Sequence, residues 1–148
     1  MDFTERQLAV ILQACVDFAG QLVGREGGFL PFGARVKADG EIEFVQLATN
    51  ESETLGDLYD RTGSLLAGEA RRNEIVAAAL IANVSLPGHH HCHGEHFHTA
   101  AVVQIETPNF CRSIVAPYRA GSSRDGKERA VEFAEMVPEE GERMMFAD

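Results

Sequence analysis

The sequence contains no tryptophan, only two tyrosines and only three cysteines among its 148 residues. The cysteines are odd in number and stand far apart, at Cys15, Cys92 and Cys111, which is typical of free thiols in a reducing compartment. The chain also lacks, near its first residue, the basic stretch and apolar core of a secretory signal. We therefore expect a cytoplasmic protein without a disulfide framework.

Long apolar runs and basic clusters are missing as well. The longest apolar stretch, residues 75–84, is shorter than the eighteen or so residues that a membrane helix needs. No run of basic residues exceeds the pair Arg71-Arg72, and the formal net charge of -10 repels nucleic-acid phosphates and anionic lipids. We expect neither a membrane span nor a nucleic-acid partner.

Motifs of the common catalytic classes are absent too. The chain has no glycine-rich dinucleotide or P-loop pattern and no Gly-x-Ser-x-Gly. The zinc-protease pattern His-Glu-x-x-His is also absent. A zinc deaminase would need Pro-Cys-x-x-Cys, and the segment that begins at Pro108 contains a single cysteine, Cys111. The sequence therefore identifies no catalytic residue.

The composition that is present is that of a folded domain. Hydrophobic residues make up 45% of the chain and charged residues 24%, which is typical of globular proteins. A chain of 148 residues can bury a core without disulfides or a structural metal. We predict a single domain over residues 1–148, with no internal repeat.

The first predicted element is a helix. Apolar residues recur at helical spacing between residues 4 and 23. Thr4 and Gln7 form the capping-box pattern that begins a helix, and Gly24 is a typical end.

A β-hairpin follows, and its register can be predicted from charge. With residues 38–40 as a three-residue loop, Lys37 lies opposite Glu41 and Arg35 lies opposite Glu43, so both cross-strand pairs join opposite charges. On the other face the same register opposes apolar residues, Val36 with Ile42 and Ala34 with Phe44. A two-residue turn would oppose apolar to acidic residues, so we prefer the longer loop.

The second half of the chain predicts a helix and then a meander. Asn50 and Glu53 form a second capping pattern, and the helix after them contains glycines that weaken it unless they are closely packed. Residues 75–86 are apolar almost throughout, so periodicity alone fits a buried strand or a buried helix. We predict a strand, because the β-like segments 101–105 and 113–115 need a partner. A last short strand is expected at 131–133.

The resulting fold class is α+β, with the order α-β-β-α-β-β-β. We expect an antiparallel sheet of about five strands with two main helices on one of its faces. In element order the chain resembles roadblock-like and profilin-like domains. That resemblance rests on element order without a shared motif, and a fold does not determine a function, so it implies none.

All six histidines lie between residues 89 and 98, together with one cysteine and one carboxylate. Imidazole and thiolate are ligands that zinc, nickel, cobalt and copper prefer, and three or four of them hold one ion. In an extended chain residues 91 and 93 point the same way, as do residues 96 and 98, and Gly94 allows a turn between the two pairs. The hypothetical metal site in the loop at 87–99 therefore comprises His91, Cys92, His93, Glu95, His96 and His98.

Two functions from different classes are compatible with this segment. The first is a non-catalytic binding or assembly module, a homodimer, whose loop is an accessory site for zinc or nickel. We expect the homodimer because a small apolar sheet has few helices to cover it. The second is a metal-dependent enzyme, which needs a base from outside the loop, such as Glu106 or Tyr118. A solvated loop that binds metal only when it is supplied is the competing interpretation of the histidines.

Overall fold

The structure is a computed structural model that describes residues 3–86, 91–92, 95–122 and 128–146. Within these residues there are two helices and nine strands, so the predicted α+β class is confirmed, with more strands than the five expected. In chain order the elements are α1 (Glu5–Glu26), β1 (Phe32–Val36), β2 (Ile42–Val45), α2 (Leu55–Arg71), β3 (Ala77–Ser85), β4 (His91–Cys92), β5 (Glu95–His96), β6 (Thr99–Thr107), β7 (Phe110–Ala120), β8 (Val131–Phe133) and β9 (Val137–Glu140).

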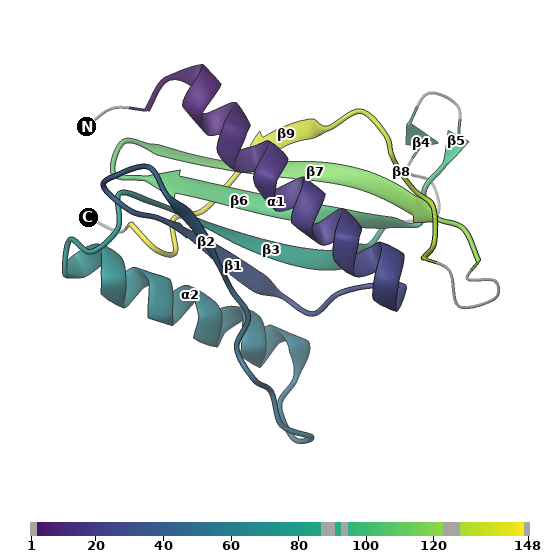
Figure 1. The fold of residues 1–148 in the computed structure, drawn as a ribbon, viewed down its shortest axis with the longest axis horizontal. Helices are drawn as coiled ribbons and strands as arrows, with labels where there is room; N and C mark the ends of the chain where they lie inside the picture. The colour runs from purple at the N-terminus through teal and green to yellow at the C-terminus, as the bar shows by residue number, and fades with distance from the viewer. Residues whose placement is uncertain (1–2, 87–90, 93–94, 123–127, 147–148) are drawn as a thin grey trace.

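Seven of the strands form one antiparallel sheet (Figure 1). Its order is β2-β1-β3-β6-β7, and both β8 and β9 pair with β7 along the outer edge. Strands β3, β6 and β7 are the predicted meander, and residues 108–109 form the predicted turn. The predicted strand at 131–133 is confirmed as β8, whereas the short strands β4, β5 and β9 were not predicted.

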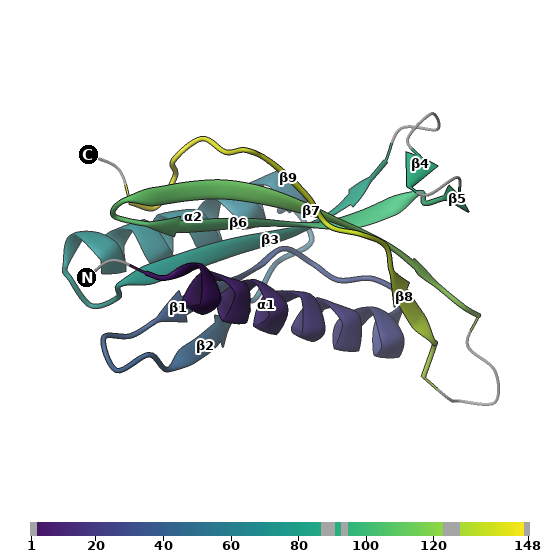
Figure 2. The same cartoon turned by 90° about the horizontal axis from the view of Figure 1, so that it is seen from above.

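The two helices cover opposite faces of the sheet (Figure 2), and the prediction that both lie on one face was wrong. On one face α1 packs over Phe32, Ala79 and Val103. On the other face α2 approaches Gly33 and Leu80. A strand between two helical layers is apolar on both sides, which explains why residues 75–86 show no alternation. The alanines of β3 are the small residues that fit between the layers.

Helix α1 begins at the predicted cap and ends later than predicted. The Thr4 hydroxyl accepts the Gln7 backbone N–H at 3.1 Å, and the Gln7 side chain accepts the Thr4 N–H at 2.8 Å. The helix continues to Glu26, and the left-handed end residue is Gly27, with φ of 84°. Gly24 is instead a buried helix position, where a Cβ atom would lie 3.4 Å from the carbonyl oxygen of Arg129.

The hairpin of β1 and β2 has the predicted register. Arg35 lies opposite Glu43, and the Lys37 backbone N–H donates to the Glu41 carbonyl oxygen at 3.0 Å. The side chain of Lys37 pairs with Glu43 at 3.1 Å rather than with its opposed residue Glu41. Arg35 also donates to both carboxylate oxygens of Glu69, at 2.8 and 3.0 Å, which joins the hairpin to α2.

Helix α2 is capped by Thr54 rather than by Asn50. Thr54 and Asp57 form the capping box, whereas the Asn50 side chain accepts the Ser52 N–H at 3.1 Å in a preceding turn. The helix is unbroken despite its glycines. Close packing explains one of them, because a Cβ atom at Gly63 would lie 3.1 Å from a methyl carbon of Leu80.

Aromatic side chains, among them Phe29, Phe32 and Phe44, pack in the core beneath α1. Phe18 of α1 stacks on Phe44 with ring centroids 4.3 Å apart and meets Phe32 edge-on at 5.1 Å. Such ring pairs contribute about 0.5–1.5 kcal/mol beyond the area they bury. They fix the helix on the sheet independently of the histidine-rich segment.

Candidate metal-binding segment

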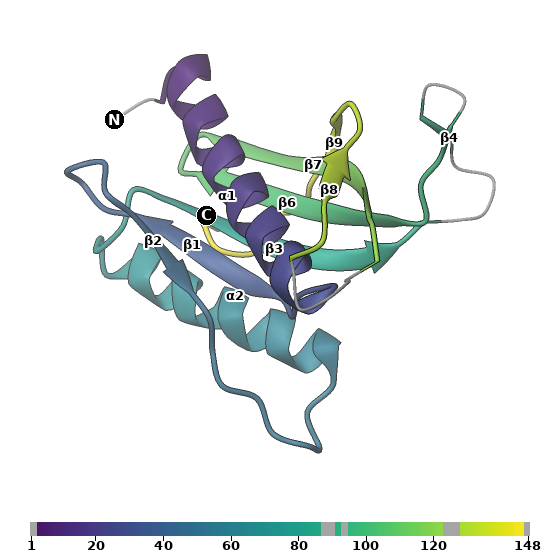
Figure 3. The same ribbon diagram turned by 45° about the vertical axis from the view of Figure 1, so that its right-hand side comes forward.

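The histidine-rich segment lies at the end of the sheet away from both chain termini, where β3 leaves and β6 returns (Figure 3). The β3–β6 ladder continues to the pair Ser85 and Thr99. One residue further, the Leu86 N–H donates to the His98 carbonyl oxygen at 2.8 Å. Backbone pairing therefore closes the base of the segment directly before residue 87.

Strands β4 and β5 form a short antiparallel ladder inside this segment. His91 lies opposite His96, and Cys92 lies opposite Glu95. Directly opposed residues of an antiparallel ladder share a face, with Cβ atoms about 4.5–5.5 Å apart. The ladder thus sets the two histidine positions on one face and the cysteine and glutamate positions on the other. The sequence predicted a loop over residues 87–99 with a turn allowed at Gly94, but it did not predict these strands, because strands of two residues leave no periodic pattern.

The structure places only part of the predicted ligand set. The backbone of β4 and β5 is described, and His93 and Gly94 lie outside the described residues. His98 is described together with its side chain, and it is exposed directly before β6. Among the residues that the structure describes, no group of three or more histidine, cysteine, aspartate or glutamate side chains gathers as metal ligands do. The six-residue ligand set stays a prediction.

Phe97 anchors the segment where it rejoins the sheet. Its residue is only 3% exposed, and the guanidinium carbon of Arg119 lies 5.1 Å from the centre of its ring. Arg119 of β7 also pairs with Glu132 of β8 at 2.9 Å. The end of the segment is therefore held by an arginine of β7 that is itself paired with β8.

Tyr118 lies at the same end of the sheet, opposite Thr99 in the β6–β7 register. Its hydroxyl donates to Asn83 Oδ1 at 2.7 Å, and its residue is 2% exposed. Burial raises the pKa of this hydroxyl above the ordinary tyrosine value, although hydrogen bonds with Thr99 and Asn83 oppose the shift. Tyr118 is consequently a neutral hydrogen-bond donor at neutral pH and not the base that an enzyme would need.

Glu106 lies at the opposite end of β6. It lies eight positions along the chain from His98, which at about 3.3 Å per residue corresponds to roughly 26 Å. Its carboxylate is fully buried and accepts N–H groups of Gln104, Met144, Met145 and Phe146. Glu106 therefore does not converge with the histidine-rich segment, and the suggestion that it serves as a base there was wrong.

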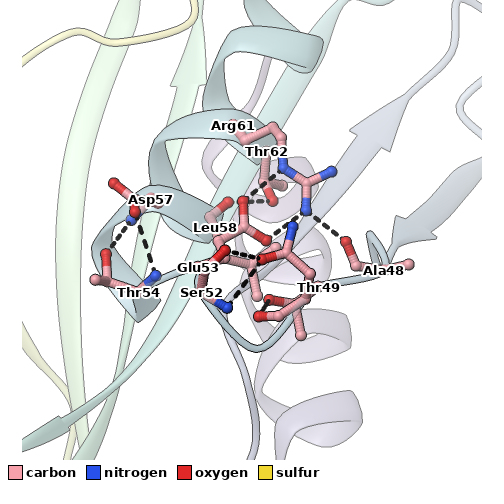
Figure 4. Close-up of polar contacts among 10 residues, drawn as sticks. Ala48, Thr49, Ser52, Glu53, Thr54, Asp57, Leu58, Arg61 and Thr62 are labelled. Atoms are coloured by element: carbon pink, nitrogen blue, oxygen red, sulfur yellow. Dashed lines mark hydrogen bonds and ion pairs between the residues drawn. The ribbon is translucent and has the colours of Figure 1, made fainter.

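A second cluster of polar contacts lies at the beginning of α2 (Figure 4). Arg61 donates two hydrogen bonds to the Glu53 carboxylate, at 2.9 and 2.8 Å, and a third to the carbonyl oxygen of Ala48. The hydrogen bond from Arg61 is the largest cause that lowers the pKa of Glu53, followed by one from Thr49. These groups bind one another and hold the β2–α2 connection on the helix, so the cluster is structural.

The described cysteines are poor nucleophiles. Burial raises the pKa of the Cys15 thiol to about 12, and the residue is fully buried in α1. Burial also raises the pKa of Cys111, and the nearby Glu106 carboxylate adds to this shift. Both thiols are protonated at neutral pH, as expected for small residues that pack rather than react.

No family model, curated protein or solved structure matches the chain. The resemblance to roadblock-like and profilin-like domains therefore rests on element order alone. Function has to be argued from the residues and their arrangement.

Proposed function

We propose that the protein is a non-catalytic binding module that holds a late first-row divalent ion, zinc or nickel, in its histidine-rich segment. The observation that carries the proposal is the register of β4 and β5, which opposes His91 to His96. Two imidazoles on one face of a hairpin can reach the same ion, because zinc–nitrogen bonds are about 2.0–2.1 Å long.

The register joins the two ligand pairs that the sequence predicts separately. In the extended chain that the sequence predicts, His93 shares a face with His91 and His98 shares a face with His96, and the cross-strand pair of His91 and His96 supports joining the two predicted pairs. We therefore assign the ion to these four histidines. In this proposal Cys92 and Glu95, which are opposed to each other in the ladder, do not bind the same ion.

The site is accessory to the fold in this proposal. The sheet is closed before residue 87 by the Leu86–His98 hydrogen bond, and the core beneath α1 is built without the segment. Metal binding then adds stability only by mass action, since the ion binds the folded hairpin better than the unfolded chain. The negative formal charge of -10 favours the approach of a cation.

Isothermal titration with zinc and with nickel tests the proposal, on the wild type and on a variant with His91, His93, His96 and His98 changed to alanine. Histidines elsewhere in the chain do not contribute to the titration, because all six lie in this segment. His89→Ala/His90→Ala serves as the matched control, because it removes two histidines that are outside the proposed set.

The expected result is binding by the wild type and by the control, and its loss in the fourfold variant. Equal affinity in the wild type and the fourfold variant would end the proposal. Unfolding of the metal-free wild type would show that the ion is structural rather than accessory.

A further inference from the structure

Helix α1 is more apolar than its contacts with the sheet account for. By length and composition alone, α1 is long and apolar enough to be a candidate membrane span. Core helices of soluble proteins also meet this criterion, but they are mostly buried. In α1 only 39% of the most apolar 18-residue window is buried. On the side of α1 that faces β6 and β7, Leu8 and Leu12 are only partly buried, and Ala9 is exposed. Exposed apolar surface of this kind marks interaction sites.

These residues line a groove between the N-terminal half of α1 and the turn end of the β6–β7 hairpin. The helix wall of the groove is formed by Leu8, Ala9 and Leu12. The strand wall is formed by Ile105, Phe110 and Ile114. The groove is open to solvent along its length and nearly all of its lining is apolar.

Two charges of opposite sign stand on opposite walls of the groove. Glu5 belongs to the helix wall and Arg112 to the strand wall, and both residues are exposed. Within the described part of the chain neither side chain forms an ion pair, although Arg112 lies opposite Glu140 in the β7–β9 register, and the guanidinium carbon of Arg112 lies 6.0 Å from the centre of the Phe110 ring. An unpaired acid and an unpaired base thus flank one apolar strip.

We propose that this groove is the interface of a two-fold symmetric homodimer. A two-fold interface is self-complementary, because each contact occurs twice with the roles exchanged. An axis through the middle of the groove sets the helix wall of one copy against the strand wall of the other. Glu5 then faces the partner subunit's Arg112, and Arg112 faces the partner subunit's Glu5, with the apolar strip between the two pairs.

Charge complementarity favours a second copy as the occupant. Two chains with a formal charge of -10 repel each other over most of their surfaces, so they meet where the local charges cancel. The groove offers one acid, one base and otherwise apolar residues, which is self-complementary. A small ligand fits less well, because ligand sites bury most of the ligand and this groove is open.

The size of the groove sets the strength of the dimer. Its eight lining residues are fewer than the roughly 20–30 per side of a standard interface, so we expect a reversible dimer at micromolar concentration. The groove lies at the turn end of the β6–β7 hairpin, whereas the histidine-rich segment lies at the other end of β6. Dimerisation is consequently independent of metal.

Sedimentation of charge-reversal variants of the full chain tests the proposal, with reductant and chelator present so that neither a disulfide nor a metal ion joins two copies. Glu5→Arg places two bases on the groove, and Arg112→Glu places two acids there, so each variant repels itself. An equimolar mixture of the two variants restores both cross pairs. Arg6→Glu is the matched control, because Arg6 lines a different groove on the other side of α1.

We expect the wild type and Arg6→Glu to dimerise, each groove variant to dimerise at least about tenfold more weakly, and the mixture to recover the dimer. Circular dichroism confirms that the exposed substitutions leave the fold intact. A monomeric wild type across the micromolar range overturns the proposal, and so does a mixture that stays monomeric. A monomeric wild type that floats with phospholipid vesicles would also overturn it, in favour of a membrane surface as the occupant.

Discussion

The carboxylate of Glu106 in β6 accepts the backbone N–H of Met145 at 3.0 Å, although 38 residues separate the two along the chain. The same carboxylate accepts the N–H groups of Met144 and Phe146 and a side-chain N–H of Gln104. Met145 is 1% exposed and belongs to the core on the α2 side of the sheet. A buried acid and a row of backbone donors thus fasten the last described residues to the central strand.

Replacing this acid should loosen the C-terminal segment. Glu106→Gln keeps the shape of the side chain but turns one acceptor oxygen into a donor that faces backbone N–H groups. Hydrogen bonds to charged groups are worth about 1.5–3 kcal/mol each, so we expect the free energy of unfolding to fall by about 1–3 kcal/mol. Urea denaturation measures this loss, and faster hydrogen exchange at residues 144–146 localises it.

Glu140→Gln is the control for that experiment, because Glu140 is an exposed acid of β9. Its effect should stay within about 0.5 kcal/mol. Equal stability of the two variants, with unchanged exchange at 144–146, would show that the Glu106 contacts do not hold the segment.

Two glycine-to-alanine substitutions should change stability in opposite directions. At Gly33 a Cβ atom would lie 2.8 Å from Leu66 and 3.0 Å from Thr62, so Gly33→Ala overpacks the contact between β1 and α2. We expect a loss of about 1–3 kcal/mol. At Gly56 the nearest atom is 3.8 Å away, on Thr54, so Gly56→Ala should add about 0.4–1 kcal/mol by restricting the unfolded chain. Thermal unfolding distinguishes these outcomes, and a neutral Gly33→Ala would contradict the packing described for α2.

Local chemistry made several elements predictable from sequence. The cap formed by Thr4 and Gln7 and the hairpin register set by Arg35 and Glu43 both depend on residues close together in the chain. Where two capping patterns lie close together, the wrong one was predicted to begin the helix. Asn50 and Thr54 both precede an acidic residue by three positions, and the structure has the capping box at Thr54.

Features that depend on distant residues were not predictable. The continuous apolar run of β3 was recognised as a strand, but the sequence did not show that helices cover both of its faces. The fastening of Met145 by Glu106 has no local signature, since an acid within an apolar strand is compatible with many partners. In the candidate site the ligand types were readable from composition, whereas the pairing of residues 91 and 96 depends on a ladder too short to leave a pattern.

Metal binding should weaken in acid. Ligation requires neutral imidazoles, and free histidine protonates at a pKa of about 6.5, so protons compete with the metal ion below that pH. With at least two histidine ligands we expect the zinc affinity to fall at least about tenfold between pH 7.5 and pH 5.5. Titrations at several pH values measure the change. An affinity independent of pH would point to ligands other than histidine.

The most direct test of the central claim compares the two faces of the β4–β5 ladder. Zinc affinity is measured by competition with a chromophoric chelator for the wild type, for His91→Ala/His96→Ala and for Cys92→Ser/Glu95→Gln. The account predicts that the histidine pair variant loses at least about a hundredfold in affinity, whereas the variant of the opposite face stays within about threefold of the wild type. The reverse order, or equal losses in both variants, would contradict the assignment of the ion to the histidine face.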